Sequence, residues 1–101
     1  MALAFRAERD GVRYEVRTAG GSVRLYTNGA FHSQFNPRHL FTGAVWDLLS
    51  LPSLALSSPP EEILLLGVGG GTVIHQLQQL HAPAALTGIE IDPLHIRIAR
   101  E

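Results

Sequence analysis

The residues best suited to chemistry form two short motifs, a run of glycines at positions 67–71 and a pair of acids, Glu90 and Asp92. Glycine lacks a Cβ, so a ligand can approach the backbone, and the first N–H groups of a following helix can meet polar ligand atoms. An acid at the tip of the next strand, about twenty residues later, can accept hydrogen bonds from ribose hydroxyls. Glu90 follows Gly67 by 23 positions, which predicts a nucleoside site.

Two other nucleotide-binding motifs are excluded because the residues that they require are missing. The dinucleotide fingerprint needs Gly or Ala at its sixth position, and Thr72 stands there when the count starts at Gly67. The count from Gly69 fails as well, and the P-loop needs a Lys that this chain lacks. Other roles remain open for the two acids. Glu90 could be a solvated acid at a strand end rather than a ribose ligand, and Asp92 could be a helix N-cap, a cofactor contact or both.

The elements around these motifs follow from the apolar pattern. Residues 63–66 predict a strand without alternation, as expected when both faces are covered. A helix starts at Thr72, a second strand covers residues 86–91, and Asp92-Pro93 predicts the start of another helix. The expected buried stripe of the first helix is Val73, Ile74, Leu77 and Leu80, with Gln76, Gln78 and Gln79 on its other side and His75 and His81 at the surface.

The N-terminal part predicts a small antiparallel meander over residues 3–35. Residues 12–18 alternate with period two, and residues 22–27 and 30–33 supply two further strands. Asn28-Gly29 is a strong hairpin signal because both positions tolerate positive φ. Four arginines are expected to form a solvated face: Arg6, Arg9, Arg13 and Arg17.

A helix is predicted between the meander and the first apolar strand, over residues 38–49. Pro37 suits its first turn, and residues 51–60, which end in two prolines, predict a linker without regular structure. The expected buried stripe of this helix is Leu40, Phe41, Ala44, Val45 and Leu48, with Trp46 at its edge.

Composition narrows the class of protein. The 101 residues are 46% hydrophobic and 17% charged, with a net charge of −1, which is a globular composition without an electrostatic case for nucleic acid or membrane partners. Cysteine is absent, which excludes disulfides and thiolate metal sites, and no metal site is predicted. The apolar stretch at the N-terminus is too short for a signal peptide, so a cytoplasmic location is expected.

The motifs together resemble a known family. Gly67-Val68-Gly69-Gly70-Gly71 with Glu90-Ile91-Asp92 looks like the first two motifs of class I S-adenosylmethionine-dependent methyltransferases. The hairpin at residues 23–29, followed by Phe31-His32-Ser33, resembles more narrowly the spermidine synthase family. The resemblance implies an α/β fold in three parts. These are an N-terminal β-meander at 1–37, a helix and linker at 38–60, and the first β-α-β unit of a Rossmann-like sheet at 61–101, incomplete and truncated before the catalytic part.

The resemblance also implies a cofactor and a reaction. Gly67, Gly69, Gly70 and Gly71 would line S-adenosylmethionine or its decarboxylated form, Glu90 would bind the ribose, and Asp92 would lie near the adenosine. His32 and His39 flank the expected entrance for a small acceptor, such as an amine of polyamine biosynthesis. His32 replaces the family's Gln, and Phe41-Thr42-Gly43 replaces its Tyr-Gln-Glu, so methyl and aminopropyl transfer both stay open. No catalytic residue is assigned. The alternative is a non-catalytic nucleoside-binding or dimerisation module, and a homodimer is possible in either case.

Overall fold

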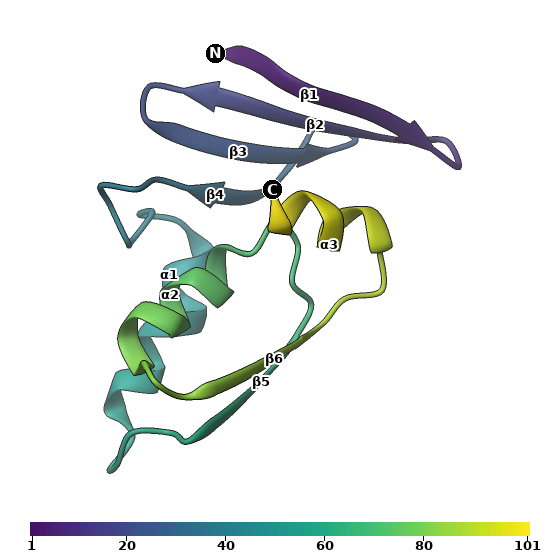
Figure 1. Cartoon of the computed structure of the whole chain (residues 1–101). Coiled ribbons are helices and arrows are strands. Elements are labelled where there is room, and N and C mark those ends of the chain that lie inside the picture. The colour runs from purple at the N-terminus through teal and green to yellow at the C-terminus, as the bar shows by residue number, and fades with distance from the viewer. The chain divides into compact units, whose positions relative to one another are not determined.

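The first forty residues form an antiparallel sheet whose four strands pair in sequence order (Figure 1). The strands are β1 (Ala2–Arg9), β2 (Val12–Ala19), β3 (Ser22–Thr27) and β4 (Ala30–Phe35). The computed structural model describes all 101 residues, and these divide into two units, Met1–Leu40 and Phe41–Glu101. The predicted meander is therefore confirmed, with one strand more than the pattern of residues 12–33 had indicated.

The Asn28-Gly29 hairpin is confirmed by its backbone. Asn28 has φ +50° and Gly29 has φ +78°, the left-handed values that a tight two-residue turn requires. The Asn28 side chain adds to the turn, because its Oδ1 accepts a hydrogen bond from the Arg13 N–H at 2.8 Å. Asp10 and Gly11 make a turn with the same signs of φ between β1 and β2.

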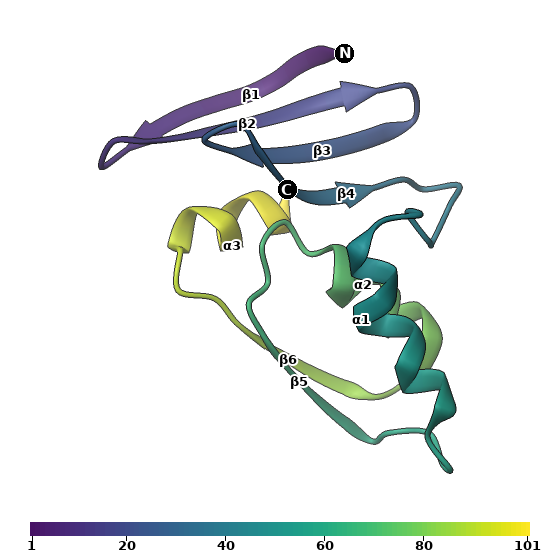
Figure 2. The same cartoon turned by 180° about the vertical axis from the view of Figure 1, so that it is seen from behind.

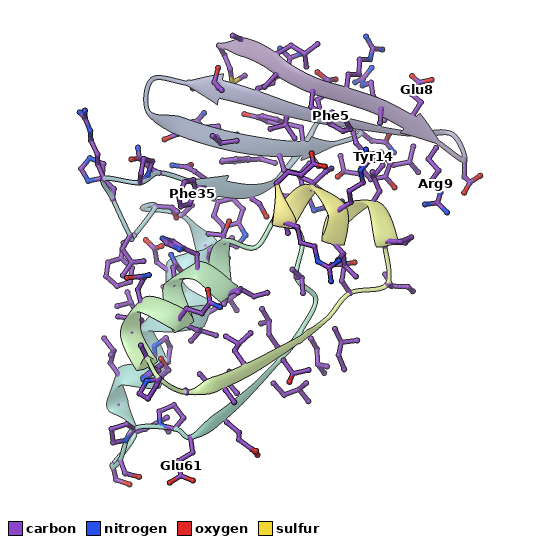
Figure 3. All side chains as sticks on the ribbon, viewed as in Figure 1. Phe5, Glu8, Arg9, Tyr14, Phe35 and Glu61 are labelled. Atoms are coloured by element: carbon purple, nitrogen blue, oxygen red, sulfur yellow. The ribbon has the colours of Figure 1, made fainter.

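One face of this sheet is apolar. Phe5, Tyr14 and Phe35 project from β1, β2 and β4 on this side (Figure 3), and the strand register adds Leu25 from β3. Tyr14 and Leu25 are buried on this face, whereas Val23 is 39% exposed.

The opposite face is polar, and Arg6, Arg13 and Arg17 lie on it with side chains that are 56%, 44% and 33% exposed, in agreement with the solvated face that was expected. Glu15 is buried on β2 and receives Arg13 Nε at 2.9 Å on one carboxylate oxygen and the Arg17 guanidinium on the other. The hydrogen bond from Arg17 lowers the pKa of Glu15. Arg6 lies 3.8 Å from Glu8 on this face. Arg9, which pairs with Val12 and so belongs to the other face, lies 3.8 Å from Asp10 near the turn after β1 (Figure 3).

The second unit contains a parallel pair of strands joined by a helix (Figures 1 and 2). β5 (Glu62–Leu66) leads into α2 (Thr72–His81), and β6 (Ala85–Ile89) returns beside β5, with Leu66 opposite Ile89. α3 (Pro93–Arg100) follows β6. The predicted order of strand, helix, strand and helix is confirmed. No helix in the chain combines the length and apolar character needed to cross a membrane.

The predicted helix over residues 38–49 is wrong in its first half and in its buried face. The helix α1 covers only Val45–Ser50, and a 3-10 helix, η1 (Leu51–Ala55), occupies part of the predicted linker. Residues 42 and 43 are instead bound to the Asp47 carboxylate, and Gly43 has φ +73°, which is incompatible with a helix. Three members of the predicted stripe are exposed: Phe41 (40%), Val45 (59%) and Leu48 (71%).

A buried polar network takes the place of that stripe. The Asp47 carboxylate accepts hydrogen bonds from Gln76 Nε2 at 2.8 Å, and Gln76 Oε1 accepts one from Ser50 Oγ at 2.7 Å. Gln76 and Ser50 are fully buried, so the prediction that Gln76 lies on the solvent side of α2 is wrong. His81 is also buried rather than at the surface, with Nε2 2.7 Å from Ser53 Oγ. These bonds join α1 and η1 to α2.

The β5–β6 sheet is covered on one face only, contrary to the expectation from its continuous apolar run. Leu64, Leu66 and Ile89 are exposed by 62%, 73% and 55%. On the other face Gly88 lies beneath α2, where a Cβ would come 3.1 Å from Ile74 Cδ1 and 2.8 Å from Val68 Cγ2.

Gly88 therefore sets how closely α2 can approach the sheet. We expect Gly88→Ala to lower the free energy of unfolding by about 1–3 kcal/mol, since overpacking forces neighbouring side chains to shift. Urea denaturation followed by circular dichroism would measure the loss. Thr87→Ser, at an exposed neighbouring position of β6, is the control and should change the free energy by less than about 0.5 kcal/mol. Equal stability of Gly88→Ala and this control would contradict the assigned packing.

Candidate functional site

The glycine loop connects the end of β5 to the start of α2. Gly67, Gly69 and Gly71 all have positive φ, at +87°, +57° and +92°. At Gly67 a Cβ would meet no atom within 4 Å, so the restriction there comes from the backbone conformation and the loop faces open space at that point. The Gly67 N–H donates to the Ile89 carbonyl oxygen at 2.8 Å, which fixes the loop to the end of β6.

The Glu90 carboxylate lies directly against this loop. Its Oε1 atom accepts hydrogen bonds from the N–H groups of Val68 at 3.0 Å and Gly69 at 2.9 Å. Its Oε2 atom accepts one from the Asp92 N–H at 2.9 Å. The side chain is only 8% exposed, so the alternative of a solvated acid at the strand end is wrong. Glu90 thus connects the glycine loop to the start of α3.

These contacts also determine the charge of Glu90. Burial opposes its ionisation, but the N–H groups of Gly69, Asp92 and Val68 and the neighbouring imidazole of His95 outweigh burial and lower the pKa of Glu90 below its ordinary value of 4.5. Glu90 is therefore a carboxylate at neutral pH, with hydrogen-bond acceptors only. This is the state that ribose hydroxyl donors require.

Asp92 begins α3 as predicted. Its Oδ1 atom accepts a hydrogen bond from the Leu94 N–H at 2.9 Å, and Pro93 occupies the first helical position. The N-cap role is confirmed, and the cofactor contact stays a prediction. The Asp92 side chain is therefore held by the helix that it starts, while the Asp92 backbone N–H is bound to Glu90 Oε2.

His95 is a neighbour of the site that the motifs did not indicate. It is buried in the first turn of α3, with Nδ1 3.9 Å from Glu90 Oε2. The signal in the sequence was its position three residues after the Asp92 cap, which turns the side chain back toward the start of the helix. Its imidazole contributes to the lowered pKa of Glu90.

The structure brings together the predicted residues of the glycine loop, Glu90 and Asp92 in the second unit. Gly70 lies half-buried within the loop. His32 on β4 and His39 after it are exposed residues of the first unit, so their role as substrate contacts stays a prediction.

The loop has a donor pattern that limits its ligands. The N–H groups of Gly67, Val68, Gly69 and Gly71 all donate to acceptors of the protein itself. A phosphate needs several such donors at a helix N-terminus. These four loop N–H groups are therefore engaged within the protein, and donors for a ligand would have to come from the first turn of α2, whose N-cap makes no side-chain hydrogen bond.

Comparisons with known proteins give the same resemblance as the motifs. Over 51 residues, half of the chain, it is 37% identical to a polyamine aminopropyltransferase of Vibrio vulnificus (strain CMCP6), and the match covers 17% of that protein. No family model matches the chain. The match thus spans well under two thirds of the length of this curated relative.

Solved structures share the fold along almost the whole chain. A spermidine synthase of Thermotoga maritima matches 99% of this chain with a TM-score of 0.73 at 17% identity, and the match covers 33% of that structure. A spermidine synthase in complex with the transition state analogue AdoDATO matches equally well, with 34% of its own length covered. A probable spermidine synthase of Corynebacterium glutamicum ATCC 13032 matches 99% of this chain at 16% identity, with a TM-score of 0.77 and 39% of its own length covered. The predicted resemblance to spermidine synthases is confirmed, for their N-terminal portion.

Proposed function

We propose that this chain supplies the nucleoside-binding part of a spermidine synthase-like transferase, with S-adenosylmethionine or its decarboxylated form as ligand. The observation that carries the proposal is the contact of the Glu90 carboxylate with the glycine loop at Val68 and Gly69. The likeness to a polyamine aminopropyltransferase and to solved spermidine synthases supports it. Under this proposal residues 61–101 are the start of a Rossmann-like sheet.

The acceptor capacity of Glu90 fits a ribose. A carboxylate offers about four acceptor positions, and the backbone hydrogen bonds of Val68, Gly69 and Asp92 occupy three of them. One position on Oε2 can therefore accept a ribose hydroxyl while the loop keeps its conformation. The open space beside Gly67 gives the nucleoside a place next to the backbone.

The charges at the site favour a cationic ligand. Glu90 and Asp92 place two acidic side chains at the end of β6, and the Val68 and Gly69 N–H groups beside them already donate to Glu90. A sulfonium nucleoside brings positive charge and hydroxyl donors without phosphate, so it matches both properties of the site.

The remaining parts of the proposal concern the whole transferase. A small acceptor such as an amine would receive a methyl or aminopropyl group, with His32 and His39 as candidate contacts. A homodimer and a cytoplasmic location belong to the same proposal. Nucleoside binding without transfer, or a role in dimerisation, is the alternative that a binding experiment alone leaves in place.

Calorimetric titration of the chain tests the ligand. We expect S-adenosylmethionine, its decarboxylated form or S-adenosylhomocysteine to bind with a dissociation constant of roughly 0.1 mM or tighter. NAD should bind at least about tenfold more weakly, because Thr72 stands where the dinucleotide fingerprint needs Gly or Ala. Absence of binding by all three sulfur nucleosides would refute the proposal.

The substitution Gly69→Val tests whether the conformation of the glycine loop is needed for nucleoside binding. A β-branched residue at φ +57° is strained, and it would displace the N–H group that binds Glu90, so nucleoside affinity should fall at least about tenfold. Gly20→Val is the matched control, since Gly20 has φ +58° in a turn of the first unit. Equal affinities of the two variants would mean that the loop is only a turn between strand and helix.

A further inference from the structure

Arg24 on β3 stands out on the polar face of the meander because no acid meets its charge. Arg17 lies directly opposite it on β2, and Gln34 lies opposite it on β4. Arg17 donates to Glu15 through Nε and Nη2. No carboxylate oxygen lies within 4.0 Å of the Arg24 guanidinium.

The position of the Arg24 guanidinium is set by aromatic rings. Its Cζ lies 5.3 Å from the centroid of the Phe31 ring, and Phe31 stacks on Tyr26 with their centroids 5.2 Å apart. A guanidinium held on an aromatic face is ordered before any ligand arrives. Its planar edge, with the N–H donors, is left to meet a partner.

One donor of Arg24 is unsatisfied. The Nε atom is inaccessible to solvent and has no hydrogen-bond partner. Buried polar atoms without a partner are uncommon in proteins, and each one suggests strain or an ion or water that completes the site. Because Nε is out of reach of solvent, a ligand would meet the Nη donors of Arg24 and change the surroundings of the Nε–H group.

The charge around Arg24 favours an anion. The strand register places six charged side chains on this face, and arginines outnumber glutamates four to two: Arg6, Glu8, Arg13, Glu15, Arg17 and Arg24. Two like charges directly opposite each other destabilise a strand pair. An anion between Arg17 and Arg24 would convert this repulsion into attraction to a shared partner.

We propose that Arg24, assisted by Arg17, binds an oxyanion, either a phosphate or a carboxylate group. The guanidinium fork matches the paired oxygens of both groups. Arg17 has five N–H donors and gives only two to Glu15, so others remain for the ligand. The site belongs to the first unit and is independent of the nucleoside proposal for the glycine loop.

The test follows the Arg24 Nε–H signal by NMR in the full chain, with arginine side chains labelled with ¹⁵N. Inorganic phosphate and succinate are titrated separately at low ionic strength. We expect a saturable shift of this signal with at least one of them, and weaker binding at high salt because the site is only partly buried. A response to phosphate alone would identify phosphate as the ligand class, and a response to succinate alone would identify carboxylate.

Substitutions assign the binding to Arg24. Arg24→Gln should weaken binding at least tenfold, monitored through the Arg17 side-chain signal. Arg38→Gln, which removes another unpaired arginine of the same unit, should leave it unchanged. Arg24→Lys keeps the charge without the fork and should weaken binding several-fold even if the Gln variant fails to fold. Shifts that do not saturate, or equal affinities of the wild type and Arg24→Lys, would overturn the proposal and leave an adventitious ion only.

Discussion

We expect Glu90→Gln to lower the free energy of unfolding by about 2–3 kcal/mol. Hydrogen bonds to a charged group are strong, and the substitution replaces at least one of them by a contact between two donors. Three backbone N–H groups point at the two carboxylate oxygens, those of Val68, Gly69 and Asp92. An amide has one oxygen and one NH₂ group, so in either orientation the NH₂ group faces an N–H donor. Urea denaturation at pH 7 followed by circular dichroism would measure the loss.

The control for this substitution is Glu61→Gln. Glu61 is an exposed acid in the loop before β5 (Figure 3), so the same change of charge there should alter the free energy by less than about 0.5 kcal/mol. A loss at Glu90 no larger than the loss at Glu61 would contradict the role of Glu90 in holding the loop.

The effect of Glu90→Gln should depend on pH. The pKa of Glu90 is lowered in the folded protein relative to its ordinary value of 4.5, so its stabilising contribution is complete above that value. The contribution is lost as pH falls through the folded pKa, because protonation removes the charge that the N–H groups stabilise. The stability difference between the wild type and Glu90→Gln should therefore shrink below pH 4.5. A difference that stays constant down to pH 3 would mean that the carboxylate charge is not involved.

The same substitution has a second consequence for ligand binding. If the remaining acceptor position of Oε2 receives a ribose hydroxyl, Glu90→Gln should weaken nucleoside binding at least about tenfold. Thermal unfolding identifies the temperature at which the variant is still folded, and calorimetry is then done below it. Unchanged affinity in a folded variant would leave Glu90 as a structural residue of the loop only.

The second large effect is expected at Asp47, whose carboxylate is buried in the network between α1 and α2. It accepts hydrogen bonds from Thr42 N–H at 2.9 Å, Gly43 N–H at 2.7 Å and Gln76 Nε2 at 2.8 Å. We expect Asp47→Asn to lower the free energy of unfolding by about 3 kcal/mol. The new NH₂ group faces a donor, and each buried donor left without an acceptor costs about 1–3 kcal/mol.

A local measurement distinguishes the Asp47 network from a general loss of stability. Amide hydrogen exchange at Thr42 and Gly43 should accelerate more than exchange in the meander, since these N–H groups lose their acceptor. Asp10→Asn is the matched control, because the Asp10 side chain is 92% exposed and its φ of +51° suits asparagine. Similar losses at the two positions would contradict the network.

Asp47 and Glu90 respond to acid in the same direction. Burial opposes the ionisation of Asp47, but hydrogen bonds from Thr42, Gly43 and Gln76 lower its pKa below the ordinary 3.8. Its contribution is also complete above that value and lost as pH falls through the folded pKa. The stability of the wild type should therefore decline in acid from both sites, and only the difference between each variant and the wild type reports one site.

The Asp47 network also explains where prediction from the residues failed. The apolar residues 40, 41, 44, 45 and 48 have helical spacing, yet the chain buries Asp47 and Ser50 against α2. Periodicity indicates which face a helix would bury if apolar contact decided the matter. Here a carboxylate with four donors and a buried glutamine 29 positions away decide it, and no local pattern reports that partnership.

Short-range geometry was read correctly from the sequence. The Asn28-Gly29 turn and the Asp92-Pro93 helix start depend on residues at most two positions apart, whose φ preferences and side-chain caps are local properties. The order of β5, α2 and β6 followed from hydrophobic runs interrupted by glycine. By itself, then, the sequence determined the hairpins and the strand–loop–helix–strand order, and it named the candidate residues of the proposed nucleoside site.

Only the tertiary structure decided what those residues touch. Glu90 is 22 and 21 positions from Val68 and Gly69, and the parallel pairing of β5 with β6 brings its carboxylate onto their N–H groups. The same pairing leaves Leu64 and Leu66 exposed. A hydrogen bond requires an acceptor within about 3 Å of its donor, and that distance is set by how the elements pack rather than by the spacing of residues along the chain.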